Sequence, residues 1–171
     1  MNIDVLTRLP HSLMGFDVFL DGVDFWGVVE SGELPDFEEE VEKFMAGTGV
    51  APVSVPVAMK EMSTKVKIAE PSPDIYKRFG QRSQLVFRGS LFASGGDEIP
   101  MVVTQTGLLQ KISGVKAEAG KRSGGIEFNH DADTITLEIN GEELIYIDNI
   151  NCIKRIGGVN LTASRLSNLG R

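Results

Sequence analysis

The stretch 31-SGELPDFEEEVEKFMAGTGVAPVSVPVAMKEM-62 decides how this chain folds, because its first half supports two incompatible structures. Pro35 suits the start of a helix, and apolar residues follow it at helical spacing, at Leu34, Phe37, Val41, Phe44 and Met45. A strand would instead turn one set of acids to a single face, at Asp36, Glu38, Glu40 and Glu42. Periodicity alone favours a helix over residues 34–45, but propensity is a weak guide that tertiary context overrides, so the choice between strand and helix stays open.

The same stretch carries the whole net charge of the protein. The formal charge is -7, and seven acids without a base lie between Glu30 and Glu42, while 17 acidic and 17 basic residues make up the rest. A solvated face is the ordinary interpretation of such a run. The sharper hypothesis is a surface that repels an anion.

A charge-free segment, 45-MAGTGVAPVSVPVAM-59, follows the acids. Its glycines and prolines argue against a regular element, and its valines argue against a loop in water. Long loops in compact domains are uncommon and usually functional, so we expect a protruding loop at about 45–60 whose apolar side chains another molecule covers. The residues expected at that interface are Met45, Val50, Pro52, Val53, Val55 and Val57. The alternative is a proline-interrupted strand packed on the protein's own core.

Most of the remaining sequence predicts β-structure. The segments 17-DVFLDGVDFWGVV-29 and 133-DTITLEINGEELIYID-148 alternate around Asp21-Gly22 and Asn140-Gly141, dipeptides that accept the positive φ of a type I′ hairpin turn. Two further strands are expected in 84–112 around Gly95-Gly96, and a short one at 65–68. Ser72, Pro73 and Gly80 mark one short helix, with Ile75, Tyr76 and Phe79 on one face, and the tail is expected to form a second short helix.

Length and composition indicate one domain over residues 1–171, since 171 residues that are 42% hydrophobic can bury one core. No apolar run approaches the roughly 18 to 20 residues of a membrane span, and the first residues do not form a secretory signal. We therefore expect no membrane insertion. The single Cys152 is expected to be buried and inert.

Motifs for chemistry are scarce. His11 and His130 lack neighbouring ligands at metal spacing, and 129-NHDADT-134 is expected to be a turn rather than a cation loop. No phosphate loop, dinucleotide fingerprint or nucleophile elbow is present. Basic residues are too few for sequence-specific DNA binding. The sequence therefore predicts no catalytic residue, no metal and no cofactor.

The order of features resembles a known family. The run 18-VFLDGVDFWGVVESGELPDFEEEVEKFMAGTGVAPVSV-55, the central 86-VFRGSL-91 and the closing 137-LEINGEELIYIDNINCIKRIGGVNLTASRLSNLG-170 are together similar to the major tail tube proteins of contractile-tailed phages and R-type bacteriocins. The resemblance covers about 16–170 and depends on the ordered set rather than on any single motif.

This resemblance implies a mainly β protein, a β-barrel or sandwich tail-tube fold with one short flanking helix and a long protruding loop. It also implies an N-terminal arm at about 1–14, a C-terminal arm at about 157–171, and a strand rather than a helix at 35–44. Six copies would form a ring, and rings would stack into a tube inside a sheath, with Asp36, Glu38, Glu40 and Glu42 lining the lumen.

The implied partners are further copies of the chain, a tail sheath protein, baseplate and tail-terminator proteins, and DNA in transit. The implied location is the virion tail, assembled in the host bacterial cytoplasm. The rival hypotheses are a monomeric β-barrel that binds a small molecule, a secretion-system tube protein and, with least support, a metal-assisted enzyme using His130.

Overall fold

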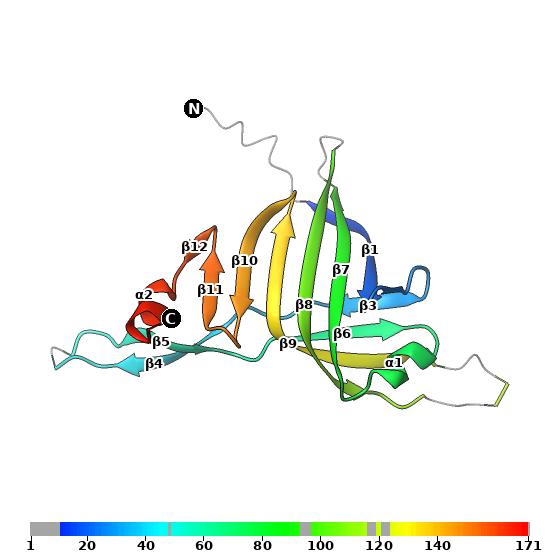
Figure 1. The fold of residues 1–171 in the computed structure, drawn as a ribbon, viewed down its shortest axis with the longest axis horizontal. Helices are drawn as coiled ribbons and strands as arrows, with labels where there is room; N and C mark the ends of the chain where they lie inside the picture. Colours follow the sequence, from blue (N-terminus) through cyan, green and yellow to red (C-terminus); the bar gives the residue numbers. More distant parts are fainter. Residues whose placement is uncertain (1–10, 48, 93–96, 116–118, 121–123, 171) are drawn as a thin grey trace.

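The computed structural model describes residues 11–47, 49–92, 97–115, 119–120 and 124–170, and it is mainly β (Figure 1). The dominant element is a 10-stranded antiparallel sheet. Eight of its strands follow the order β12-β11-β10-β9-β8-β7-β1-β2, and the other two, β6 and β3, form a branch. β4 and β5 form a separate two-stranded sheet. The predicted mainly β fold class is confirmed.

The strands of the main path are mostly neighbours in sequence. Their bounds are β1 Ser12–Leu20, β2 Val23–Asp24, β7 Arg82–Phe92, β8 Glu98–Ile112, β9 Ile126–Ile139, β10 Glu142–Asp148, β11 Ile153–Ile156 and β12 Val159–Asn160. Pro100 lies in β8 opposite Ser90, just before β8 starts to pair with β9 at Met101. A missing N–H is therefore tolerated at that position.

The sheet branches along β9. Residues 126–131 of β9 pair with β6 (Ser63–Ile68), whereas residues 134–139 pair with β10, and β8 runs beside both halves. β3 (Val29–Glu33) lies on the far side of β6. The lower half of β9 and β6 therefore cross beneath the upright strands, and the two layers enclose the core (Figure 1).

The core lies inside this fold. Phe16 and Phe87 stack with ring centroids 5.2 Å apart, and Phe128 is fully buried. Most of the other buried apolar residues alternate along the strands, as one buried face requires: Val18, Leu20, Val66, Ile68, Leu85, Val103, Leu109, Ile126, Ile135 and Ile147.

The two-residue turns have the backbone that was expected of them. Asp21 and Gly22 have φ of 48° and 79°, and Asn140 and Gly141 have φ of 54° and 77°. The flanking pairs Leu20–Val23 and Ile139–Glu142 are in register across them. The turn expected at Gly95-Gly96 lies outside the described residues, as do residues 1–10 of the expected N-terminal arm.

Two short helices flank the sheet, α1 (Pro73–Lys77) and α2 (Ala163–Asn168), where the family resemblance implied one. The prediction that α1 buries one face is wrong in part: Ile75 is fully buried, but Tyr76 and Phe79 are 44% and 56% exposed. No helix among the described residues has the length and apolar character needed to cross a membrane.

Two smaller expectations are also wrong. His130, expected in a turn, lies within β9 and is fully buried. Cys152, expected to be buried, is exposed in the turn between β10 and β11, with φ of 57°.

Candidate assembly interface

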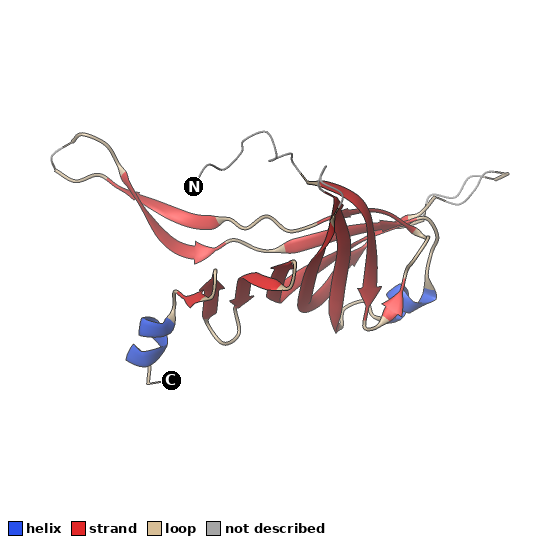
Figure 2. Ribbon diagram, turned by 90° about the horizontal axis from the view of Figure 1, so that it is seen from above, coloured by secondary structure: helices blue, strands red, loops and turns tan. Residues whose placement is uncertain are grey.

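The stretch with two possible readings forms a β-hairpin. β4 (Glu39–Phe44) pairs antiparallel with β5 (Val53–Met59), and no helix forms over residues 34–45. The expected loop at 45–60 is therefore corrected: only residues 45–52 connect the strands, and most of the rest is a strand. The hairpin extends away from the main sheet as an arm (Figure 2).

Pro56 explains why the sequence did not predict the strand β5. Pro56 cannot donate a ladder hydrogen bond, and the pairing shifts by one residue there, so that Glu40 lies opposite Ala58 and Val41 opposite Pro56. Val57 is the extra residue of this bulge. A strand with a bulge at its proline does not show the alternation of a regular strand.

The hairpin exposes apolar side chains to an unusual degree. Val41 on β4 is 45% exposed and Phe37, two residues before β4, is 39% exposed, so neither side chain is buried in the core. The residues assigned to the protruding interface are also exposed: Met45 at 58%, Val50 at 91%, Val53 at 58%, Val55 at 48% and Val57 at 50%, with Pro52 exposed beside them. These side chains are not covered by the subunit's own core.

A two-stranded sheet is marginally stable on its own. β4 and β5 pair with each other and with no other described strand, so both outer edges carry unpaired backbone groups. Exposed edges and exposed valines on one arm are the features that a neighbouring molecule would cover.

The acids at the base of the hairpin are partly neutralised. Glu38 accepts a hydrogen bond from Lys60 at 2.6 Å, which raises the pKa of Lys60. Glu30 pairs with Lys67 at 2.6 Å and Glu33 with Lys65 at 3.5 Å across β3 and β6. Of the four residues assigned to the lumen, Asp36, Glu40 and Glu42 are exposed and form no ion pair with the described residues, so they keep most of the anionic surface.

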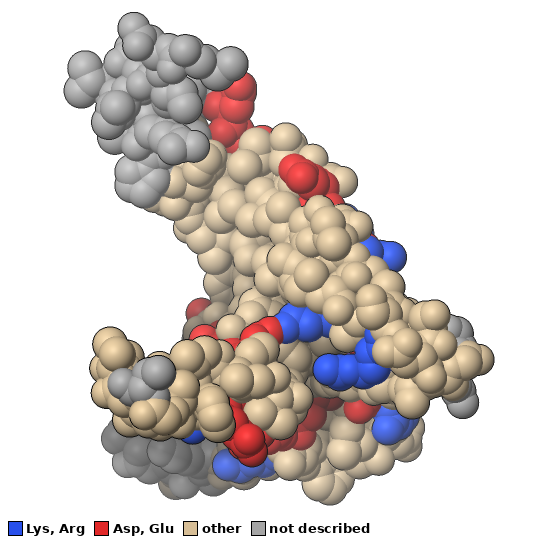
Figure 3. Space-filling model, turned by 90° about the vertical axis from the view of Figure 1, so that its left-hand side faces the viewer, with Lys and Arg blue, Asp and Glu red and all other residues tan. Residues whose placement is uncertain are grey.

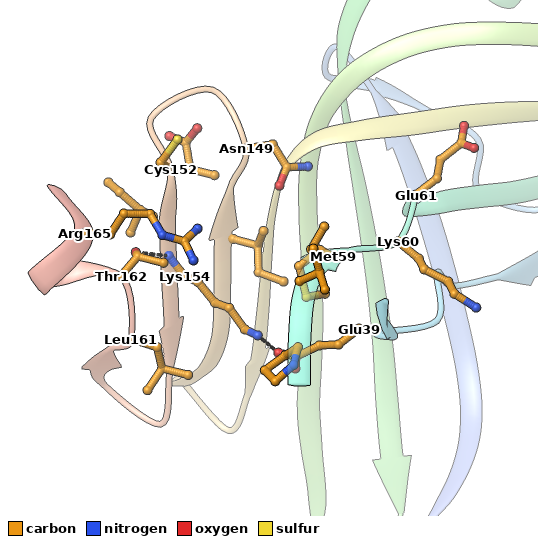
Figure 4. Close-up of a pocket in the computed structure, with 16 residues that line it drawn as sticks. Glu39, Met59, Lys60, Glu61, Asn149, Cys152, Lys154, Leu161, Thr162 and Arg165 are labelled. Atoms are coloured by element: carbon orange, nitrogen blue, oxygen red, sulfur yellow. Dashed lines mark hydrogen bonds and ion pairs between the residues drawn. The ribbon is translucent and has the colours of Figure 1, made fainter. Parts of the chain in front are cut away.

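Glu39 faces the opposite way from Glu40 and forms an ion pair with Lys154 of β11. This contact joins the base of the hairpin to the C-terminal strands (Figure 4). Glu39, Pro56, Met59, Lys154 and Leu161 are among the residues that line a groove of about 640 Å³ between the two parts. The surface is hollowed beside the hairpin when the molecule is viewed from this end (Figure 3).

Hydrogen bonds fix the position of Lys154. Its backbone N–H donates to Thr162 Oγ1 at 3.0 Å, and Thr162 Oγ1 donates to Asn160 Oδ1 at 2.9 Å. The next residue of β11, Arg155, binds both oxygens of Glu143 on β10, at 2.6 and 3.0 Å, and lies 4.6 Å from the centre of the Tyr146 ring. The C-terminal strands thus form a firm support for the hairpin.

The turn before β11 is held by one carboxylate. Asp148 Oδ1 accepts hydrogen bonds from the backbone N–H groups of Ile150 and Asn151, at 3.0 and 2.9 Å. Burial opposes the charge of Asp148, but these bonds and one from the Asn151 side chain outweigh it and lower its pKa.

Among the described residues, no three His, Cys, Asp or Glu side chains gather in an arrangement that would hold a metal. The distinctive feature of the surface is therefore the protruding hairpin and its anionic base. Comparison with known proteins identifies the family that carries it.

The model of the phage tail tube protein FII family matches residues 10–170. The chain belongs to this family. It is 24% identical over 170 residues to the tail tube protein of Escherichia phage P2, covering 95% of this chain and 98% of that protein. The predicted family is confirmed, and the chain is a structural tail tube protein.

Solved structures show the same fold. The cap that terminates the tube of the anti-feeding prophage has a TM-score of 0.61 at 14% identity, covering 81% of this chain and 99% of that one. A chain of the sheath-tube complex of the PVC extracellular contractile injection system has a TM-score of 0.57 at 11% identity, covering 81% and 97%.

Sequence reasoning missed several of the residues that define this region. The ion pair of Glu39 could not be found from the sequence, because its partner Lys154 is distant in the chain and no local pattern marks it. Asn160 and Thr162 form a short polar turn motif that could have been found from their spacing.

Proposed function

We propose that six copies of this tail tube protein form a ring and that stacked rings form the inner tube of a contractile tail, through which DNA passes. The observation that carries this proposal is the hairpin of β4 and β5, which projects from the body with its valines exposed. In the assembly, each hairpin lies against a neighbouring copy, within the ring or in the next ring.

Burial of the hairpin supplies the driving force. A valine side chain contributes on the order of 1.5 kcal/mol when it passes from water into a dry interface. Val50, Val53, Val55 and Val57 are available in every copy. A closed ring also removes unpaired sheet edges, because each edge strand meets the next subunit.

The anionic base of the hairpin faces the bore in this arrangement. Asp36, Glu38, Glu40 and Glu42 of six copies place about 24 carboxylates in each ring. Exposed charges act over a distance of about 8 Å at physiological salt, so a lining in a narrow channel repels DNA phosphates. The lining thereby keeps the genome from adhering during passage.

The remaining partners follow from this architecture. A sheath surrounds the tube, baseplate and terminator proteins bind its ends, and assembly takes place in the host bacterial cytoplasm before the tube becomes part of the virion. The role requires no catalytic chemistry, because guiding a polymer depends on shape and charge.

Purified full-length protein provides the test. We expect negative-stain electron microscopy to show rings or tubes, and sedimentation to show that their abundance increases with protein concentration. A monomer of 18.6 kDa at every concentration would refute the proposal.

The groove at Lys154 is the observation that favours the rival monomeric small-molecule binder. That function expects the hydrophobic segment to close over the molecule's own pocket. The arm instead extends beyond the body (Figure 2). Of the arm's residues, only those at its base contribute to the lining of the groove. Thermal stabilisation of a concentration-independent monomer by a small apolar ligand would favour the rival.

A further inference from the structure

A buried polar cluster in the main sheet is not used by the tube function. His130 on β9 is fully buried, and its Nε2 lies 3.1 Å from both the hydroxyl and the carbonyl oxygen of Ser83 on β7. Its Nδ1 lies 2.7 Å from Nε2 of Gln105 on β8. Gln105 Oε1 accepts a hydrogen bond from Thr64 on β6 at 2.7 Å. The cluster thus joins four strands.

The partners determine the proton position on the ring. The carbonyl oxygen of Ser83 can only accept, so His130 Nε2 carries the proton and donates it. The NH₂ group of Gln105 also donates to the backbone carbonyl of His130 at 3.2 Å. This second bond requires that the NH₂ group of Gln105, and not its oxygen, faces Nδ1. Nδ1 is therefore an acceptor, and the ring is neutral.

A second proton cannot be accommodated without breaking the cluster. Protonated Nδ1 would face the NH₂ group of Gln105, donor against donor. If Gln105 turned its amide over, its oxygen would face the carbonyl oxygen of His130, acceptor against acceptor. Either arrangement leaves a buried polar group without a partner, which is costly.

The cluster lies at the branch of the sheet. Here β9 changes its partner from β6 to β10, and β8 has irregular pairing at Thr106–Gly107 and at Leu109–Lys111. Gly107 approaches β9 so closely that a Cβ would lie 1.7 Å from the backbone oxygen of Asp131. Loss of the cluster would therefore affect both layers at once.

We propose that the His130 cluster makes this fold acid-sensitive: neutral His130 holds β6, β7, β8 and β9 together at the branch, and protonation of Nδ1 releases them. The transition occurs in mild acid, where ordinary carboxylates are still ionised. It is a property of each subunit and does not depend on the ring arrangement.

The charged groups around His130 do not remove this sensitivity. Three carboxylates favour its protonation, those of Asp131 and Asp133 on β9 and Asp21 in the turn after β1. Two of them are paired with cations, Asp133 with Arg82 and Asp21 with Arg78, and thus have a weakened field. Asp131 neighbours His130 in the strand, and alternation directs its side chain to the opposite face.

Burial is the largest effect on the ring, and it lowers the pKa of His130 despite these carboxylates. In mild acid, His130 therefore binds a proton in the unfolded chain and stays neutral in the folded chain. Stability is full above the unfolded pKa of about 6.5 and decreases as pH falls toward the folded pKa. The ratio of folded to unfolded protein approaches a tenfold loss per pH unit in that window.

Denaturant titration of the full-length chain from pH 7.5 to 5.0 tests the proposal, with light scattering to confirm the same assembly state at each pH. We expect the wild-type ratio to fall toward tenfold per unit below about pH 6.5. His130→Gln should lose this dependence, and His11→Gln, which alters the exposed second histidine, should retain it. Equal slopes in wild type and His130→Gln would overturn the proposal.

If His130→Gln does not fold, nitrogen NMR of the wild type tests the proposal instead. We expect the His130 ring to remain the neutral Nε2–H form at pH values below the ordinary histidine pKa of about 6.5. A His130 ring that protonates near its ordinary pKa while the chain stays folded would contradict it.

Discussion

Glu39 at the base of the hairpin forms an ion pair with Lys154 of β11, across 115 residues of sequence. The side chain of Lys154 is 21% exposed and that of Glu39 is 38% exposed, so the pair is partly shielded from water. The pair connects the two-stranded sheet, through Glu39, with the C-terminal strands, through Lys154. We infer that it sets the direction in which the hairpin leaves the body.

Glu39→Gln should therefore loosen the hairpin and cost about 1 kcal/mol of unfolding free energy, the upper range for a partly exposed pair. Hydrogen exchange should become faster over residues 39–44 and 53–59. Glu42→Gln is the matched control, since Glu42 forms no ion pair with a described residue. Equal exchange in the two variants would rule out the orienting role.

The valines of β5 are expected to be essential for assembly and dispensable for folding. Val53→Asp with Val55→Asp should leave the circular dichroism spectrum and melting temperature almost unchanged, because both positions are exposed in the subunit. It should abolish tubes, because new charges would be trapped in a dry interface. Val53→Thr with Val55→Thr should still assemble, more weakly. Normal tubes from the aspartate variant would exclude these valines from the interface.

The acidic residues should act on DNA rather than on assembly. Glu38→Lys, Glu40→Lys and Glu42→Lys together should still give tubes, but a tail carrying them should deliver DNA more slowly, because phosphates would bind the lysines. The same three residues changed to Gln remove repulsion without adding attraction and should have a smaller effect. Unchanged delivery kinetics in the lysine variant would refute the repulsive lining.

Gly107 should be intolerant of any side chain. The Cβ of Gly107→Ala would lie 1.7 Å from a backbone oxygen of β9, which the sheet cannot move cheaply. We expect a loss of about 3 kcal/mol or more, at the upper end for overpacked sites. Gly114→Ala meets nothing within 4 Å and should change stability by about 0.5 kcal/mol or less. Similar stability of the two variants would contradict the close approach.

Local chemistry made parts of the fold predictable. Asp-Gly and Asn-Gly between alternating runs signal two-residue turns, because these residues tolerate positive φ, and the observed φ values at Asp21 and Asn140 agree with that reasoning. α2 was also expected from the tail. The features of these segments depend on residues close together in the chain.

The hairpin was harder to predict because its apolar residues do not serve the subunit's own core. The spacing of Phe37, Val41 and Phe44 matches that of an amphipathic helix, yet these side chains are 39%, 45% and 63% exposed. Periodicity methods assume that apolar residues face the same chain. Only the ordered resemblance to a family favoured the strand.

His130 illustrates a second limit. Its flanking residues are those of a polar turn, but cross-strand neighbours satisfy its ring inside the sheet, and those neighbours lie 25 and 47 residues away. Which polar groups meet in a core depends on strand register, which no local pattern specifies.

Hydrogen exchange of the hairpin in assembled and free protein tests most directly whether neighbouring copies complete this subunit. We predict that amides on the outer edges of β4 and β5 exchange rapidly in the free subunit and become strongly protected when tubes form. Equally rapid exchange in tubes and free subunits would show that the hairpin stays uncovered, and would contradict the account.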